Sequence, residues 1–302
     1  LPDLRILGLL FGFYIIHLTS TGWSLNTADA IFESQKILLG IGCFVWANHL
    51  IQQPSRRSIL LQLIVFSGFF IAGYSLFEML NQPNNVTAFT FTMAGHENLL
   101  SSLLFLFIPF ILVMLSKAGS RAKALGLCTL LVLLITIAVI GTRSVFIAMV
   151  GAVLFYALIG FIQKKSALVQ KIAIGAFPVL MILGFTLLMN LYKSNDTVSD
   201  KKMASFTERL LLWEKTTKVI EENPVIGVGA GNWQYNYAKF SVADIDKANF
   251  YNVFFKRPHN DFLWVWAEVG IIGFTILLVL IIFLGSKSLR HVFKTQDQKA
   301  RI

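Results

Sequence analysis

Charged residues are scarce in this 302-residue sequence. Asp, Glu, Lys and Arg together make up 14% of it, whereas ordinary soluble domains carry about 25%. This scarcity excludes a soluble globular protein, and the rest of the composition agrees, with 56% hydrophobic residues and a mean hydropathy of +0.68. The sequence therefore predicts an all-α fold, a polytopic helix bundle in a membrane.

Cysteine is almost absent as well. Only Cys43 and Cys128 occur, each inside an apolar stretch, so small buried core residues are a better interpretation than a disulfide or a metal pair. His96 and Glu97 are adjacent rather than four residues apart, so they lack the spacing that puts two metal ligands on one helix face. We expect no bound metal and no cofactor.

Apolar stretches of roughly 17–25 residues, the length that crosses a bilayer, predict eight transmembrane helices. They are Leu4–Leu18, Ile37–Ile51, Ile59–Leu80, Leu99–Ser116, Ala124–Ile140, Val145–Ile162, Ile172–Leu191 and Phe262–Leu284. The first of them lacks the short length and the cleavage site of a signal peptide, and the chain begins with Leu1 rather than Met. We therefore expect the chain to be part of a longer protein.

Lys and Arg are missing from one connection, Asn81–Asn98. If the eight spans alternate in direction, this connection lies on one side and the clusters of basic residues lie on the other. By the positive-inside rule the basic side is cytoplasmic, so both ends of the chain are inside and Tyr192–Pro258 is outside. Topology thus explains the net charge of +10, and we expect no nucleic-acid partner.

The long outer segment is predicted to be partly helical. Ser205 and Glu208 have the spacing of a capping box, which predicts a helix start at Ser205, and Asn223–Pro224 ends that helix. The polar run Lys193–Lys202 is expected to be the most mobile part. The stripe predicted to be buried comprises Phe206, Leu210, Trp213, Thr217 and Ile220.

Glycines alternate in the stretch NPVIGVGAGNW, at Gly227, Gly229 and Gly231. The lysine and hydroxyl of a nucleotide phosphate loop are missing, so tight turns between two helices are the better interpretation. Trp233, Tyr237 and Phe240, which follow on one helical face, could stack on sugar rings. Burial against lipid or other helices is the better interpretation.

Three side chains on the predicted outer side stand out: Arg143, Arg209 and His259. Taken singly, each has a structural interpretation, as an interfacial arginine, a loop arginine paired with Glu208, or an interfacial histidine. Taken together, two fixed cations and one base that is neutral near pH 7 predict a site that binds a phosphorylated substrate and moves a proton.

Other polar side chains accompany these three. Asn260 and Asp261 follow His259 directly, and His96 lies at the mouth of another predicted helix. Anchoring at the membrane interface is one interpretation of such residues, and contact with the substrate is the alternative. We therefore treat Asn260, Asp261 and His96 as candidate supporting residues.

The order of these motifs resembles the bacterial O-antigen ligase and O-antigen polymerase superfamily. The resemblance is carried by TRSVFIAMVGAVLF, ERLLLWEKTTKVIEENPVIGVGAGNW and HNDFLWVWAEVGIIG. Ligases of this superfamily have a His and a Gly with ten residues between them, as His259 and Gly270 have. Where the family often has Arg, three residues and Leu, this chain has Arg143 followed by Ile147.

The resemblance implies a multi-pass glycosyltransferase of the bacterial inner membrane with a periplasmic active site. It would move a glycan from undecaprenyl diphosphate to a hydroxyl of lipid A-core or of another glycan, within membrane lipids and without a metal. Arg143 and Arg209 would hold the diphosphate, and His259 would be the catalytic base.

The implied organisation has three parts. Residues 1–191 form a transmembrane bundle of seven helices, residues 192–258 form a periplasmic loop that carries part of the active site, and residues 259–302 hold the catalytic-His motif, the last helix and a cytoplasmic tail. The sequence does not predict an oligomeric state.

Other functions stay open. An O-antigen or exopolysaccharide polymerase and a protein O-oligosaccharyltransferase share the donor and differ in the acceptor; the His-to-Gly spacing favours the ligase. A transporter or lipid flippase would need paired intramembrane charges, which the predicted spans lack.

Overall fold

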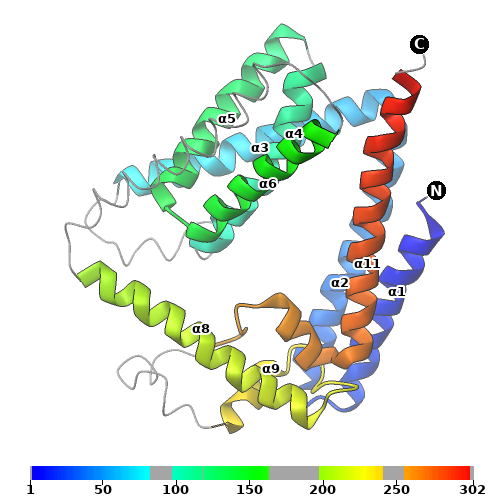
Figure 1. Cartoon of the computed structure of the whole chain (residues 1–302), viewed down its shortest axis with the longest axis vertical. Helices are drawn as coiled ribbons and strands as arrows, with labels where there is room; N and C mark the ends of the chain where they lie inside the picture. Colours follow the sequence, from blue (N-terminus) through cyan, green and yellow to red (C-terminus); the bar gives the residue numbers. More distant parts are fainter. Residues whose placement is uncertain (1, 82–96, 118, 163–196, 241–254, 300–302) are drawn as a thin grey trace. The chain divides into compact units, whose positions relative to one another are not determined.

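The computed structural model describes residues 2–81, 97–117, 119–162, 197–240 and 255–299 (Figure 1). Within these ranges the regular structure is helical and contains no strand, so the predicted all-α class is confirmed. The elements are α1 (Leu4–Thr19), η1 (Ser20–Gly22), α2 (Thr27–Gln52), α3 (Pro54–Asn81), α4 (Glu97–Lys117), α5 (Ser120–Ile140), α6 (Arg143–Ile162), α8 (Thr197–Glu222), α9 (Trp233–Asn236), η3 (Tyr237–Lys239) and α11 (Asp261–Lys299).

Six helices in the described ranges are long and apolar enough to cross a membrane, so the chain is a multi-pass membrane protein. They are Leu4–Gly22, Thr27–Gln52, Pro54–Asn81, Asn98–Ser116, Ser120–Ile140 and Asp261–His291. A further predicted span lies on α6, where the apolar stretch Ser144–Phe155 is shorter. The predicted span Ile172–Leu191 lies outside the described residues.

Two predicted features of the helices are wrong. The span predicted from Ile37 belongs to a helix that begins at Thr27, because the charged residues in its first turns lower the hydropathy without breaking the helix. Cys43 and Cys128 are free cysteines with exposed side chains rather than core residues. An apolar position on a membrane helix faces lipid as readily as protein, so the sequence alone does not distinguish the two.

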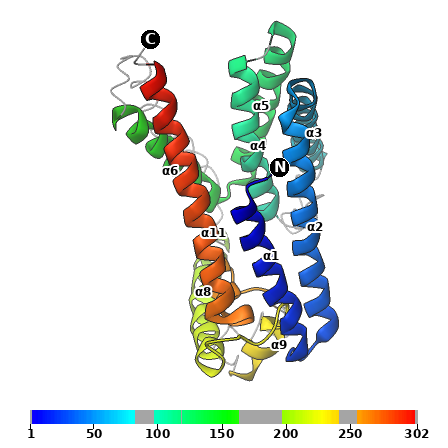
Figure 2. The same ribbon diagram turned by 90° about the vertical axis from the view of Figure 1, so that its right-hand side faces the viewer.

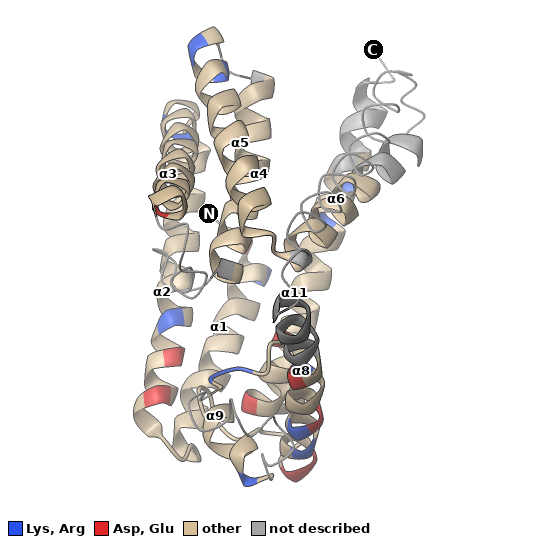
Figure 3. Cartoon of the chain, turned by 90° about the vertical axis from the view of Figure 1, so that its left-hand side faces the viewer, with Lys and Arg blue, Asp and Glu red and all other residues tan. Residues whose placement is uncertain are grey.

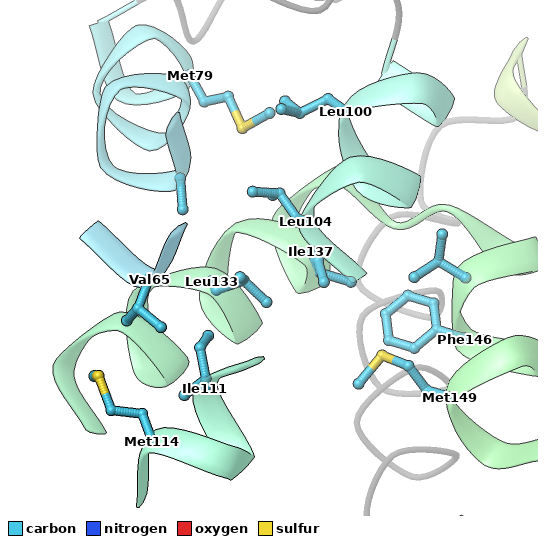
Figure 4. Close-up of a cluster of buried hydrophobic side chains, with 12 residues drawn as sticks. Val65, Met79, Leu100, Leu104, Ile111, Met114, Leu133, Ile137, Phe146 and Met149 are labelled. Carbon is cyan, nitrogen blue, oxygen red and sulfur yellow. The ribbon is translucent and has the colours of Figure 1, made fainter. Parts of the chain in front are cut away.

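The chain divides into two compact units. Unit 1 consists of Leu1–His49 together with Asp196–Ile302, and unit 2 consists of Leu50–Asn195. In unit 2, α5 packs against α3 and α4, and α4 also contacts α6. Figure 4 shows its apolar core, where Met79 of α3 points toward Leu100 of α4, and Leu104 and Ile137 belong to the same cluster.

Close approach of the helices in unit 2 depends on small residues. A Cβ at Gly68 of α3 would lie 3.0 Å from the ring of Phe107 on α4, which is the type of contact that small residues allow between membrane helices. Two polar pairs are buried in the same unit. The hydroxyls of Ser101 and Thr142 are 2.8 Å apart, and Thr136 donates to the carbonyl of Ala72 (3.2 Å).

In unit 1, α1 and α11 run side by side (Figure 2). The Asp3 side chain accepts a hydrogen bond from the Arg5 N–H and so caps the start of α1. It also pairs with Lys287 of α11 at 2.8 Å. The Lys287 ammonium, with help from the Arg5 N–H, lowers the pKa of the Asp3 carboxyl, which keeps the carboxyl charged.

Helix α8 packs against α11 in unit 1. Figure 3 shows Lys, Arg, Asp and Glu gathered on α8 and on the first turns of α2. The predicted end of this helix is confirmed, since α8 stops at Glu222, directly before Asn223–Pro224.

The predicted start of α8 is wrong, and its predicted buried stripe is only partly correct. The helix begins at Thr197, so it includes part of the run predicted to be mobile, because Lys, Met and Ala are good helix formers whatever their polarity. The described buried stripe is Leu212, Lys215, Thr216, Val219 and Ile220. These positions have helical spacing and include Ile220 of the predicted stripe, whereas Leu210 is 46% exposed and Thr217 is also exposed.

Candidate functional site

A break in helix α11 organises the site of unit 1. Gly270 has φ 67° and ψ −174°, which are not helical values. A Cβ at this position would lie 2.0 Å from the carbonyl oxygen of Val225, so only glycine fits. The predicted last span is therefore interrupted. A short segment from Asp261 to Val269 precedes the break, and a long helix follows it.

The segment Asn223–Asn232, here called the glycine loop, replaces the hydrogen bonds that the break removes. Val228 N–H donates to the carbonyl of Ala267 (2.9 Å), and Gly229 N–H donates to the carbonyl of Glu268 (2.8 Å). In return, Ile271 N–H donates to the carbonyl of Pro224 (2.9 Å). The loop backbone thus satisfies backbone groups that would otherwise be unpaired in an apolar environment.

The glycines of this loop are required by its shape. Gly227, Gly229 and Gly231 have φ values of 71°, 98° and 68°, so the prediction of tight turns is confirmed. Gly227 also lies against the break itself, because a Cβ there would be 2.4 Å from the carbonyl of Glu268. The backbone of the glycine loop therefore packs directly against the backbone of α11 at the Gly270 break.

Glu268 fixes the loop through its side chain. Only 4% of this residue is exposed, and its carboxylate accepts hydrogen bonds from the N–H groups of Gly231 (2.7 Å) and Trp233 (3.2 Å). A buried carboxylate is tolerated when such donors compensate for lost water. Sequence reasoning missed Glu268, although an ionisable residue within a predicted transmembrane stretch is itself a functional signal.

The connection between α1 and α2 holds the opposite side of the loop. Ser20 Oγ accepts a hydrogen bond from Ala230 N–H (2.9 Å). Asn232 accepts from Asn26 N–H (2.7 Å) and donates to the carbonyl of Asn26 (3.1 Å). The glycine loop is therefore clamped between this connection and α11.

Two aromatic residues complete the packing around the loop. Trp233 and Tyr237 are 0% and 2% exposed and stack with their ring centroids 4.3 Å apart. The indole N–H of Trp233 donates to the Thr216 hydroxyl of α8 (3.0 Å). The prediction that these rings are buried is confirmed, and they join α8 to the glycine loop.

His259 occupies a constrained turn directly before α11. Its φ of 58° is the one positive value at a non-glycine residue among the described positions, and such a conformation costs roughly 1–2 kcal/mol. The buried Pro258 before it accepts a hydrogen bond from the indole N–H of Trp213 on α8 (2.9 Å). The His259 side chain is exposed, so the turn presents the imidazole while its backbone is held.

Asn260 and Asp261 have different positions in this turn. Asn260 caps α11, because its side-chain oxygen accepts hydrogen bonds from the N–H groups of Phe262 (3.1 Å) and Leu263 (3.3 Å). Asp261 is exposed in the first turn of α11, where a negative charge favours the helix dipole. Asn260 therefore fixes the direction in which α11 leaves His259.

Arg209 comes from α8, the helix whose Trp213 contacts the His259 turn. It lies on α8 one turn before Trp213, on the same helix face, at a rise of about 6 Å, and its side chain is partly exposed. Since Trp213 holds Pro258, Arg209 lies one turn of α8 away from the residue that contacts the His259 turn, within unit 1. Nothing in the sequence around Arg209 or around His259 predicts the hydrogen bond from Trp213 to Pro258.

The remaining predicted site residues are not placed with this group. Arg143 begins α6, two residues after Gly141, which ends α5 in the left-handed conformation; this confirms that Arg143 opens a helix. It belongs to unit 2, and its side chain is not described. His96 lies outside the described residues. The joining of Arg143 to the His259 turn stays a prediction.

Comparison with known protein families identifies the chain. The model of the O-antigen ligase family matches residues 127–278, about half of the chain. This segment contains Arg143, Arg209, the glycine loop, His259 and Gly270. Comparisons with curated proteins and with solved structures find no match. The family match confirms the resemblance read from the sequence motifs, and the chain belongs to the O-antigen ligase family of membrane glycosyltransferases.

Proposed function

We propose that this protein transfers a glycan from undecaprenyl diphosphate to a hydroxyl of lipid A-core, at the periplasmic face of the bacterial inner membrane. The observation that carries the proposal is the His259 turn. It is held by Trp213, capped by Asn260 and followed by the Gly270 break that receives the glycine loop. This arrangement presents an exposed imidazole in a turn that is held in place, and Arg209 lies one turn of α8 from the Trp213 that holds it.

The proposed reaction needs one proton acceptor and one anion site. As the acceptor oxygen attacks the anomeric carbon, an imidazole nitrogen of His259 takes the hydroxyl proton. The bond between the anomeric carbon and the diphosphate oxygen breaks, and its electron pair leaves with undecaprenyl diphosphate. Arg209 and Arg143 stabilise the negative charge that develops on the leaving group, a role that planar guanidinium groups perform without a metal.

The length of α11 supports the periplasmic position of this turn. After the break the helix runs from Ile271 to Lys299, about 42 Å at 1.5 Å per residue, which exceeds the roughly 30 Å of a hydrocarbon core. Lys287 and Arg290 lie towards its far end. The positive-inside rule puts that end in the cytoplasm, so His259 faces the periplasm.

The donor fits this position. Its polyprenyl tail lies among the membrane helices while its diphosphate lies at the level of the headgroups, close to the start of α11. The periplasm supplies no nucleotide sugar, so a glycan already activated on a lipid is a suitable substrate. The polymerase and the protein O-oligosaccharyltransferase share this donor and are the alternatives to the ligase.

A transporter or flippase is the alternative from another class, and the break in α11 is the feature that it would use. Broken helices in transporters expose backbone groups to a substrate or an ion. Here the carbonyls of Ala267 and Glu268 accept hydrogen bonds from the glycine loop, so they are occupied within the protein. The enzyme is therefore the better proposal.

The test is a transfer assay with purified protein. The donor is undecaprenyl-diphosphate glycan, offered with lipid A-core, with a second carrier-linked glycan, or with a peptide, in the presence and absence of EDTA. We expect transfer to lipid A-core, unaffected by EDTA. His259→Gln should lower transfer by about 10²–10⁴-fold while donor binding is retained.

The control is His49→Gln, because His49 is an exposed histidine of α2 outside the site. It should transfer as the wild type does. Near-normal transfer by His259→Gln would show that His259 is not the catalytic base, and Asp261 or His96 would become the next candidates. Transfer only to the second glycan or to the peptide would replace the ligase by the polymerase or by the protein O-oligosaccharyltransferase.

A further inference from the structure

A third arginine, Arg257, lies two residues before the proposed base. Its guanidinium carbon is 4.3 Å from the centre of the Trp264 ring on α11, and its side chain is exposed. Among the residues that the structure describes, no carboxylate forms an ion pair with it. The Arg257 guanidinium thus contacts an aromatic ring, and no Asp or Glu side chain in the described ranges neutralises its charge.

Stacking orients a guanidinium in a particular way. The guanidinium carbon of Arg257 lies over the indole, and a guanidinium that stacks on an aromatic face keeps the N–H donors at the edge of its plane available. These edge donors match the oxygens of a phosphate, which accept two parallel hydrogen bonds from one guanidinium. A stacked arginine is therefore prepared to bind a phosphate with less loss of side-chain freedom than a mobile one.

Arg257 lies close in sequence to His259, the proposed catalytic base. The buried Pro258 separates Arg257 from His259 and is bound by Trp213 of α8. Arg209 lies one turn from Trp213 on the same face of α8. Arg257 and His259 therefore flank the residue by which α8 holds the start of α11, and Arg209 lies one turn of α8 from that contact.

We propose that Arg257 is a further binding residue for the diphosphate of the lipid-linked donor, and that Trp264 is the positioning residue that orients it. The proposal rests on the proposed function. When the glycosyl bond breaks, the leaving diphosphate gains one negative charge. A cation held next to the base, in addition to Arg209 and Arg143, stabilises that charge.

The test measures binding and transfer on the full-length purified protein in a detergent with a neutral headgroup. Binding of undecaprenyl diphosphate and the KM for the glycan donor are compared for the wild type, Arg257→Ala and Arg257→Lys. Loss of a charge-assisted hydrogen bond is expected to weaken both roughly 10- to 100-fold in each variant, because Lys has neither the fork nor the flat face. The control is Lys256→Ala, an exposed neighbouring cation, which should change binding less than about twofold.

Variants of Trp264 separate orientation from general stability. Trp264→Leu removes the ring and should weaken diphosphate binding about two- to fivefold, the factor expected for an exposed cation–π contact. Trp264→Phe keeps a ring and should restore most of the affinity. In the double variant Arg257→Ala with Trp264→Leu, the effect should be no larger than that of Arg257→Ala alone, since Trp264 acts on binding through Arg257.

The outcomes also distinguish this proposal from the proposed function. If the wild type does not transfer glycan but Arg257→Ala still weakens binding of undecaprenyl diphosphate, the proposed reaction is wrong and the diphosphate site stands. If Arg257→Ala binds as Lys256→Ala does, the site is wrong. If Arg257→Ala matters only in vesicles that contain phosphatidylglycerol, the arginine binds a lipid headgroup, and the proposal is overturned.

Discussion

Replacing Gly270 by alanine should lower both the stability and the glycan transfer of the protein, because alanine does not fit the backbone at this position. The residue has φ 67° and ψ −174°, a conformation that costs an L-residue of order 1–3 kcal/mol. The added Cβ would lie 2.0 Å from the carbonyl oxygen of Val225 and 2.6 Å from the backbone nitrogen of Ile226. Backbone atoms of a packed loop move only if the loop moves, so the glycine loop must separate from α11.

Separation removes three backbone hydrogen bonds between the loop and the break. At about 0.5–1.5 kcal/mol each, together with the strain, the loss of stability is about 3–7 kcal/mol. Such a loss should lower the apparent Tm by about 10 °C or more. The same movement frees the end of α8, so glycan transfer should fall with it, although the substitution is eleven residues from His259.

The measurement is thermal unfolding in detergent, with transfer activity on the same preparation. The matched control is Gly285→Ala on the same helix, where a Cβ meets nothing within 4 Å. An alanine in a helix is about 0.5–1 kcal/mol more favourable than glycine, so this variant should have the wild-type Tm or a slightly higher one. If Gly270→Ala unfolds at the wild-type temperature, the fitted contact between the loop and the break is refuted.

Three further predictions concern the buried carboxylate, the arginines and the orientation. Glu268→Gln leaves one good acceptor for two backbone N–H groups, so we expect it to lose about 1–3 kcal/mol and Glu268→Ala to lose more; an Ala variant as stable as the wild type in thermal unfolding would contradict this. Arg143→Lys, Arg143→Ala and Arg209→Ala should each lose most glycan transfer at normal protein levels in the membrane, and wild-type transfer would return that arginine to a structural role. In a cysteine-free background, an impermeant maleimide added to spheroplasts should label Cys at Glu222 directly and Cys at Arg290 only after permeabilisation; the reverse pattern would invert the topology.

The apolar patterns predicted the helices well because burial in lipid constrains composition strongly. Some local signals were equally successful, since a glycine in a tight turn or an Asn-Pro after a helix acts through its own backbone. The capping-box signal at Ser205 was not, because α8 begins at Thr197. This explains why Gly227, Gly229 and Gly231 and the end of α8 are as predicted. It also explains why Arg143 is found at the start of a helix.

The contacts that build the site join residues that are far apart in sequence. Asn26 and Asn232 are 206 residues apart in sequence, and Trp213 and Pro258 are 45 apart, so no local pattern announces either pair. The break of α11 at Gly270 could not be predicted from the sequence, because hydropathy carries no information about backbone angles. Glu268 was the one detectable signal that sequence reasoning missed, a carboxylate inside an apolar stretch.

The central claim is that His259 removes the proton of the acceptor hydroxyl during glycan transfer. The most direct test is a single-turnover measurement with donor already bound, in which the rate of transfer is followed against pH for the wild type and His259→Gln. The wild-type rate should fall on acidification, because only the neutral ring accepts a proton. His259→Gln should be about 10²–10⁴-fold slower and should lack that fall, whereas a variant that keeps a comparable rate and the same fall would contradict the claim.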